Sequence, residues 1–156
     1  MDIKKIKILV VSLFSVVLFG CSISTPVMVS GKYEGLANLN PKKGTVYIYR
    51  DDSYFGATNQ YDVMVDGVLM GSLPRASFFT VDLDPGEHRI EPRTLPDFKL
   101  GKGSSITTEK GKTYCMKLKV NFCFGCKSAD IDQVDKALCE REMKSSEKVR
   151  LEKPGK

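Results

Sequence analysis

The chain has 156 residues and a formal net charge of +5, with one histidine and no tryptophan. The single histidine, His88, excludes a histidine-rich metal site, and its position where a turn enters a strand predicts a half-exposed strand residue. The sequence contains neither a glycine-rich phosphate-binding loop nor a basic cluster interleaved with aromatic residues. We therefore predict no cofactor, no metal and no nucleic-acid partner.

Residues 1–20 have the three parts of a lipoprotein signal peptide. Three lysines precede an almost unbroken apolar run from Ile8 to Phe19, and a glycine directly precedes Cys21. A helix of this length would cross roughly 18 Å of a ~30 Å hydrocarbon core, which disfavours the alternative of an uncleaved membrane anchor. We predict that Cys21 is acylated and holds the mature protein on the membrane through its lipid.

Cleavage before Cys21 would leave one domain of moderate charge. The signal carries three lysines and Asp2, so the net charge falls from +5 by 2 to +3. Ser22 stands where an aspartate would signal retention in the inner membrane, and by analogy with other bacterial lipoproteins this favours the outer membrane, facing the periplasm. We predict a tether over residues 21–43, a domain over 44–143 and a charged tail over 144–156.

Short β-rich segments bounded by turn residues predict an all-β domain. Segments 61–65 and 68–72 flank Asp66-Gly67, the preferred pair for a type I′ hairpin turn because both positions need φ > 0. Segments 104–109 and 112–122 flank Lys110-Gly111 and predict a second hairpin. Three more strands are expected at 44–50, 77–83 and 87–92, with a reversal at Pro85-Gly86 between the last two.

One helix is expected after these strands. Asp130 and Gln133 have the spacing of a capping box, and an apolar stripe follows at Ile131, Val134, Leu138 and Met143. Together these elements predict a mainly β fold, an antiparallel β-sandwich of about seven strands with one C-terminal α-helix.

Four short motifs occur in a fixed order, namely VYIYR at 46–50, VDG at 65–67, PGEH at 85–88 and GKTY at 111–114. This series resembles the bacterial lipoprotein family catalogued as domain of unknown function 2846, over roughly residues 44–122. The resemblance implies a β-sandwich and an envelope location, and it implies no reaction and no site residues. From the residues themselves, we expect Arg50 to pair with a carboxylate such as Asp51 or Asp52. The cysteine-rich segment after Tyr114 departs from the family pattern.

Four cysteines remain beyond Cys21, and an even number in an oxidising compartment predicts two disulfides. Cys115 and Cys123 lie on one predicted strand about 27 Å apart at ~3.4 Å per residue, whereas bonded cysteines have Cα atoms within about 7 Å. Cys115–Cys126 fails for nearly the same reason. Because the helix runs back along the sheet, we prefer Cys115–Cys139 together with Cys123–Cys126.

The pair Cys123 and Cys126 also has the Cys-x-x-Cys spacing of thiol–disulfide oxidoreductases, close to a helix start that would lower a thiol pKa. A four-cysteine zinc site is disfavoured, because only one such pair is present. We therefore expect a lipid-anchored, non-enzymatic binding or assembly module. Its partner would be an unidentified envelope protein or cell-wall component, and thiol–disulfide oxidoreductase is the alternative.

Overall fold

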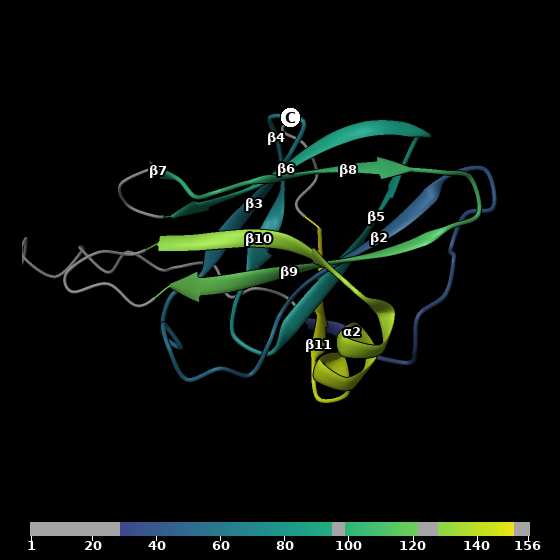
Figure 1. The fold of residues 1–156 in the computed structure, drawn as a ribbon. Coiled ribbons are helices and arrows are strands. Elements are labelled where there is room, and N and C mark those ends of the chain that lie inside the picture. The colour runs from purple at the N-terminus through teal and green to yellow at the C-terminus, as the bar shows by residue number, and fades with distance from the viewer. Residues whose placement is uncertain (1–28, 95–98, 122–127, 152–156) are drawn as a thin grey trace, which may run out of the picture.

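The computed structural model describes residues 29–94, 99–121 and 128–151. These residues form two β-sheets around a shared hydrophobic core, with a short helix near the C-terminus (Figure 1). The elements are β1 (Val29–Lys32), β2 (Gly44–Arg50), β3 (Tyr61–Val65), β4 (Val68–Leu73), β5 (Ser77–Leu83), β6 (Gly86–Thr94), β7 (Lys99–Leu100), β8 (Ser104–Thr108), β9 (Thr113–Asn121), β10 (Ser128–Val134), α2 (Lys136–Met143) and β11 (Glu147–Val149).

The two sheets are open, and one of them is mixed. The six-stranded sheet has the order β1-β11-β5-β2-β9-β10, and the five-stranded sheet has the order β4-β3-β6-β7 with β8 also paired to β6. Parallel pairing joins β2 to β9 and β11 to β5. The expected mainly β class with two layers and a helix is confirmed. The expectation of about seven strands, all antiparallel, is wrong, because local patterns report neighbouring strands and miss pairs that are distant in sequence.

Turn residues predicted one hairpin correctly and misassigned one other connection. Asp66 and Gly67 join β3 to β4 with φ of 50° and 80°, which confirms the predicted hairpin. The turn at Gly111 instead carries the chain from β8 in one sheet to β9 in the other. The turn at Pro85-Gly86 likewise links β5 and β6, which belong to different sheets. The same turn chemistry serves a hairpin or a crossover between sheets, so sequence alone does not distinguish them.

Strand β9 shows the predicted alternation of its two faces. Met116 and Leu118 point into the core shared by the two sheets. Cys115 lies on the opposite face, in a smaller apolar cluster that forms beneath α2. That second cluster consists of Tyr47, Tyr49, Phe78, Cys115, Cys139 and Met143.

The helix begins later than the capping pattern predicted. Asp130 and Gln133 belong to β10, which pairs with β9 along its whole length, so the predicted helix start near Asp130 is wrong. The N-cap is Asp135, whose Oδ1 accepts a hydrogen bond from the Leu138 N–H at 2.9 Å. Seven paired residues outweigh a local capping preference, and Ile131 enters the core from a strand instead of a helix.

The fold extends beyond both ends of the predicted domain 44–143. Strand β1 comes from the predicted tether and β11 from the predicted charged tail, and the two pair with each other beside β5. Val149 of β11 is 2% exposed and belongs to the shared core. Residues from both ends of the described chain therefore complete the six-stranded sheet.

Candidate binding site

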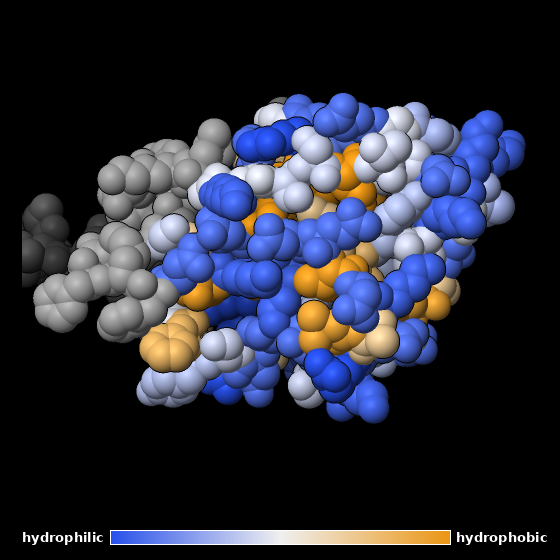
Figure 2. Space-filling model, in the orientation of Figure 1, coloured by the Kyte–Doolittle hydropathy of each residue, from blue (hydrophilic) through white to orange (hydrophobic). Residues whose placement is uncertain are grey.

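The loop of residues 51–60 connects β2 in one sheet to β3 in the other. At its tip Tyr54 is 83% exposed and Phe55 is 57% exposed. The face drawn in Figure 2 is largely hydrophilic with scattered apolar patches. Two adjacent aromatic side chains with this exposure make the loop a candidate for contact with another molecule.

Arg50 holds this loop from inside the molecule. Its side chain is 1% exposed, and its guanidinium donates to the carbonyls of Asn59 at 2.7 Å, Gly56 at 2.7 Å and Phe55 at 3.2 Å. The guanidinium also lies over the ring of Tyr61, 5.0 Å from its centroid. Burial lowers the pKa of Arg50, but arginine stays charged at neutral pH. The loop backbone thus supplies the hydrogen bonds to both terminal nitrogens of a buried charge, while the buried Nε has no hydrogen-bond partner among the described residues, and these bonds tie the loop conformation to the core.

The aspartates that were expected to pair with Arg50 bind other partners, so that expectation is wrong. Asp51 lies 2.8 Å from the Lys117 ammonium and also accepts the Ser53 N–H at 3.1 Å. Asp52 accepts a hydrogen bond from Arg75 at 2.6 Å on the surface. Alternation along the strand explains why Asp51 does not pair with Arg50. Arg50 points inward like Ile48, whereas Asp51 points to the other face of the sheet. Three successive residues therefore hold the start of the loop.

Gly56 allows the loop to approach the core closely. Its φ is +66°, and a Cβ at this position would lie 3.0 Å from the Tyr61 hydroxyl and 3.0 Å from a methyl of Val120. Two loop hydrogen bonds complete the turn, from the Ala57 N–H to the Tyr54 carbonyl at 3.1 Å and from the Asn59 N–H to the Gly56 carbonyl at 2.9 Å. The tip is thus presented by an ordered backbone.

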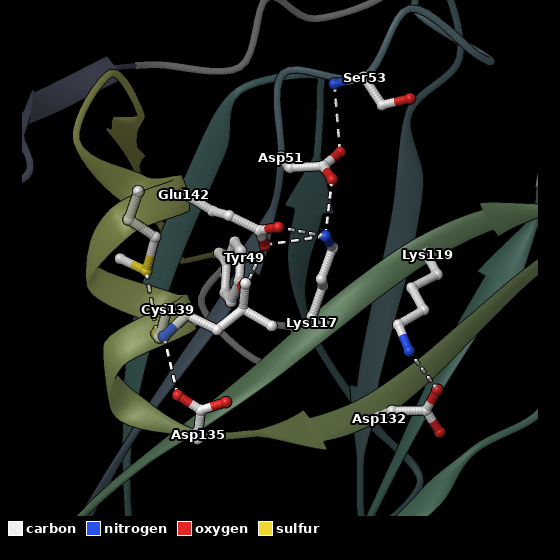
Figure 3. A network of polar contacts seen from close by, with 11 residues as sticks. Tyr49, Asp51, Ser53, Lys117, Lys119, Asp132, Asp135, Cys139 and Glu142 are labelled. Atoms are coloured by element: carbon white, nitrogen blue, oxygen red, sulfur yellow. Dashed lines mark hydrogen bonds and ion pairs between the residues drawn. The ribbon is translucent and has the colours of Figure 1, made fainter.

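A charged network lies next to the start of the 51–60 loop, on the outer face of the six-stranded sheet (Figure 3). Lys117 of β9 lies 2.8 Å from Asp51 and 2.8 Å from Glu142 of α2. The Tyr49 hydroxyl donates to Glu142 at 2.7 Å. Burial lowers the pKa of Lys117, but the two carboxylates outweigh it and raise that pKa above its usual value. Burial, followed by the bond to Glu142, raises the pKa of Tyr49 far above its usual value.

This network joins α2 to β2, β9 and the start of the 51–60 loop. Lys117 is charged and Tyr49 is protonated at neutral pH, so neither supplies a base or a nucleophile there. Its role in the fold is to fix the helix and the loop with respect to each other.

The structure brings together one of the predicted cysteine pairs. Cys115 of β9 and Cys139 of α2 lie at disulfide distance, with their Cα atoms 6.2 Å apart. Both are buried, at 1% and 0% exposed, and the Met143 sulfur lies 3.4 Å from that of Cys139. Cys21, Cys123 and Cys126 lie outside the described residues, so the acylation site and the Cys123–Cys126 pair remain predictions.

His88 is more enclosed than a half-exposed strand residue, with a side chain 14% exposed. Its Nδ1 lies 2.7 Å from the Asp66 carboxylate and its Nε2 2.7 Å from the Asp84 carbonyl oxygen. Burial lowers the pKa of His88, but these two contacts outweigh it and raise the pKa above its usual value. Burial raises the pKa of Asp66, but His88 and the Arg89 N–H outweigh it and lower that pKa. His88 thereby links two turns at one end of the five-stranded sheet.

The described residues define a β-rich domain whose surface feature is a loop held by a buried arginine. Within them, no group of three or more His, Cys, Asp or Glu side chains is placed to bind a metal ion. In the same part of the chain, no helix has the length and hydrophobicity to cross a bilayer.

A family model described as protein of unknown function (DUF2846) matches residues 40–128, more than half of the chain. The chain therefore belongs to this family, which confirms the resemblance seen in its motifs. No curated protein matches the sequence significantly. The matched range contains Arg50, the 51–60 loop and Cys115, and it ends before Cys139 and the helix.

The aromatic tip of this loop was not predicted from the sequence. A signal was present, since Tyr54 and Phe55 stand between Ser53 and Gly56 in a segment with no strand periodicity. Two adjacent aromatics in such a turn-rich segment have no place in a strand face and indicate exposure. The anchoring role of Arg50 carried no comparable signal, because its partners are backbone carbonyls.

Proposed function

We propose that this chain is a lipid-anchored protein of the bacterial envelope that acts as a non-enzymatic binding or assembly module. The loop of residues 51–60 supports this function, because Tyr54 is 83% exposed on a backbone held by a buried arginine. A pre-ordered loop loses little conformational entropy on binding, and a tyrosine ring offers a large contact area with few rotatable bonds. The partner would be another envelope protein or a cell-wall component.

Site-specific photocrosslinking tests this role of the loop. A photoreactive phenylalanine analogue at position 54 should give discrete crosslinked products in intact cells. The matched control places the same analogue at Lys110, an exposed turn residue at the opposite end of the sheet. Products from position 54 and none from position 110 would support binding through the loop. No products from position 54, or equal products from both positions, would contradict it.

The proposed anchor rests on the sequence pattern that ends at Cys21, with the outer membrane and its periplasmic face as the expected location. A Cys21→Ser variant should lose its acyl chains and move from the membrane fraction to the soluble fraction, as intact mass and fractionation would show. Retention in the membrane of a variant whose intact mass shows that residues 1–20 are removed and that no acyl chain is present would contradict lipid anchoring.

The second candidate is a thiol–disulfide oxidoreductase that uses Cys123 and Cys126. Because Cys115 lies at disulfide distance from Cys139, Cys123 and Cys126 are left to pair with each other. This is the observation that favours the second candidate. A catalytic pair should be reduced readily by glutathione and should accelerate insulin reduction, whereas a structural pair should resist reduction. Disulfide mapping after graded reduction would separate these outcomes.

A further inference from the structure

Strand β5 is paired along its whole length on one side and along only two residues on the other. All seven residues from Ser77 to Leu83 pair with β2. On the opposite side, β11 pairs only with Ser77 and Phe78. The rest of this edge, residues 79–83, has no strand beside it within the described part of the chain.

The free backbone groups on this edge are those of Thr80 and Asp82. The Glu147 N–H donates to the Ala76 carbonyl at 2.9 Å, which places the pairing with β11 on the side of residues 76 and 78, while the Ala76 N–H donates to the Asp51 carbonyl on the β2 side. Because successive residues of a strand point to alternate sides, Thr80 and Asp82 direct their backbone groups to the same side as residue 78, toward the place where β11 has ended. No hydrogen bond joins these groups to another described residue. As far as the described residues go, the edge therefore offers an unused row of donors and acceptors.

A hollow of about 660 Å³ lies at this place, between the edge of β5 and residues 148–151. Phe79, Val149 and Leu151 line it, and of these Leu151 is exposed, at 37%, whereas Phe79 and Val149 belong to the buried core beneath it. Among the described residues that line it, the charged ones are Lys148 and Arg150, both basic. The hollow thus suits an apolar side chain that is followed or preceded by a carboxylate.

The edges at β4, β1 and β10 are modified or covered. Strand β4 has an irregular register opposite Val63 and Met64, and β1 has one next to Val149. The outer edge of β10 is met by the Lys102 carbonyl, which accepts the Ile131 N–H at 3.0 Å. Irregular pairing and covering segments are the usual protections of sheet edges. The register of β5 with β2 is regular throughout, so this edge remains a template for another strand.

We propose that the open edge of β5 binds an extended peptide segment of a partner protein by strand addition. The segment lies beside Thr80 and Asp82, places an apolar side chain in the adjoining hollow and directs an acidic side chain toward Lys148. This surface is separate from the 51–60 loop. If the test of one surface contradicts its proposal, the proposal for the other surface still stands.

The test uses the full chain, isotope-labelled in detergent, and a synthetic hexapeptide Val-Thr-Glu-Val-Thr-Val with blocked ends. We expect the peptide to shift the amide resonances of Thr80 and Asp82 and to slow their hydrogen exchange at least about tenfold. Lys148→Glu should weaken binding about 1.5- to 5-fold, the range of an exposed ion pair. A peptide with lysine in place of glutamate should show the reverse preference.

A matched pair of variants checks the backbone contact. Thr80→Pro removes the edge N–H and should abolish binding, whereas Thr80→Val keeps that N–H and should preserve it. If Thr80→Pro fails to fold, the charge reversal at Lys148 still decides the site. The proposal is overturned if millimolar peptide leaves both amides unchanged, or if the shifts fall on β4 or β10. Protection of Thr80 that grows with protein concentration without peptide would instead identify a second copy as the occupant.

Discussion

Arg50 carries a buried positive charge whose two terminal nitrogens donate to three backbone carbonyls instead of a carboxylate. Replacement by methionine would keep much of its volume and remove every donor. The three loop carbonyls would then lose their donor, and the cost is limited because part of the exposed loop can turn its carbonyls to water. We therefore expect Arg50→Met to lower the free energy of unfolding by about 2–4 kcal/mol. Urea denaturation measures this loss, and faster proteolysis within residues 51–60 should accompany it.

Arg75 provides the matched control for this substitution. Its ion pair with Asp52 holds the same loop, but its side chain is 38% exposed. Exposed pairs contribute about 0–1 kcal/mol, so Arg75→Met should change stability by less than about 1 kcal/mol. Equal effects of the two variants would show that Arg50 does not hold the loop as we infer.

His88 and Asp66 give the fold a defined dependence on pH. The raised pKa of His88 means that its contribution is complete below about pH 6.5 and is lost as the pH rises through the raised value. The lowered pKa of Asp66 means that its contribution is complete above about pH 4 and is lost as the pH falls through the lowered value. The pair therefore stabilises most between these limits.

We expect the wild-type protein to lose on the order of 0.5 kcal/mol of stability between pH 6 and pH 9, since Asp66 is half exposed. The variant His88→Gln should lose less over the same range. His88 is the single histidine, which makes this comparison specific. Parallel stability profiles of the two proteins, from urea denaturation at each pH, would contradict the role assigned to this pair.

The helix α2 is short and owes its position to two cross-connections with the sheet. One is the Cys115–Cys139 pair, and the other is the contact of Glu142 with Lys117 and Tyr49. Closing a loop with a sequence separation of 24 residues restricts the unfolded chain by about 3 kcal/mol. We expect Cys139→Ser to lower the free energy of unfolding by about 2–4 kcal/mol and to leave the predicted Cys123–Cys126 pair intact.

Cys115→Ser and the double variant test whether this loss comes from the cross-link. Each single serine variant should destabilise the fold similarly, and the double variant should add little beyond one of them. An unchanged melting temperature for Cys139→Ser would show that the cross-link does not hold the helix.

Elements with a strong local signal were predictable from sequence. The β3–β4 hairpin follows from Asp66-Gly67, and the two faces of β9 follow from alternating residue types. The helix start failed because Asp130 and Gln133 satisfy a capping pattern while their backbone pairs with β9. A capping interaction contributes about 1 kcal/mol, which does not compete with seven paired residues and the burial of Ile131.

The candidate binding site depends on contacts between residues far apart in sequence. Arg50 meets the ring of Tyr61 from the other sheet, and Asp51 meets Lys117 from β9. The first contact needs the two sheets to pack together, and the second needs β2 to pair in parallel with β9, which no turn residue indicates. The sequence therefore predicted the residues VYIYR as a strand and could not predict what the arginine holds.

At the scale of the whole molecule, the ends of the described chain complete the sheet that carries the core. The boundary predicted at residue 143 places Val149 in a charged tail, whereas the structure places it in the core at 2% exposed. If Val149 is part of the core, Val149→Ala should lower the free energy of unfolding by about 1–3 kcal/mol.

Lys148, its partly exposed neighbour, provides the control, because Lys148→Ala should change stability by no more than about 0.5 kcal/mol. Denaturation of both variants under the same conditions distinguishes a core strand from a tail. A loss confined to Val149→Ala means that β11 unfolds together with the rest of the domain. If neither variant differs from the wild type, β11 contributes no stability and the narrower domain of residues 44–143 is the cooperative unit.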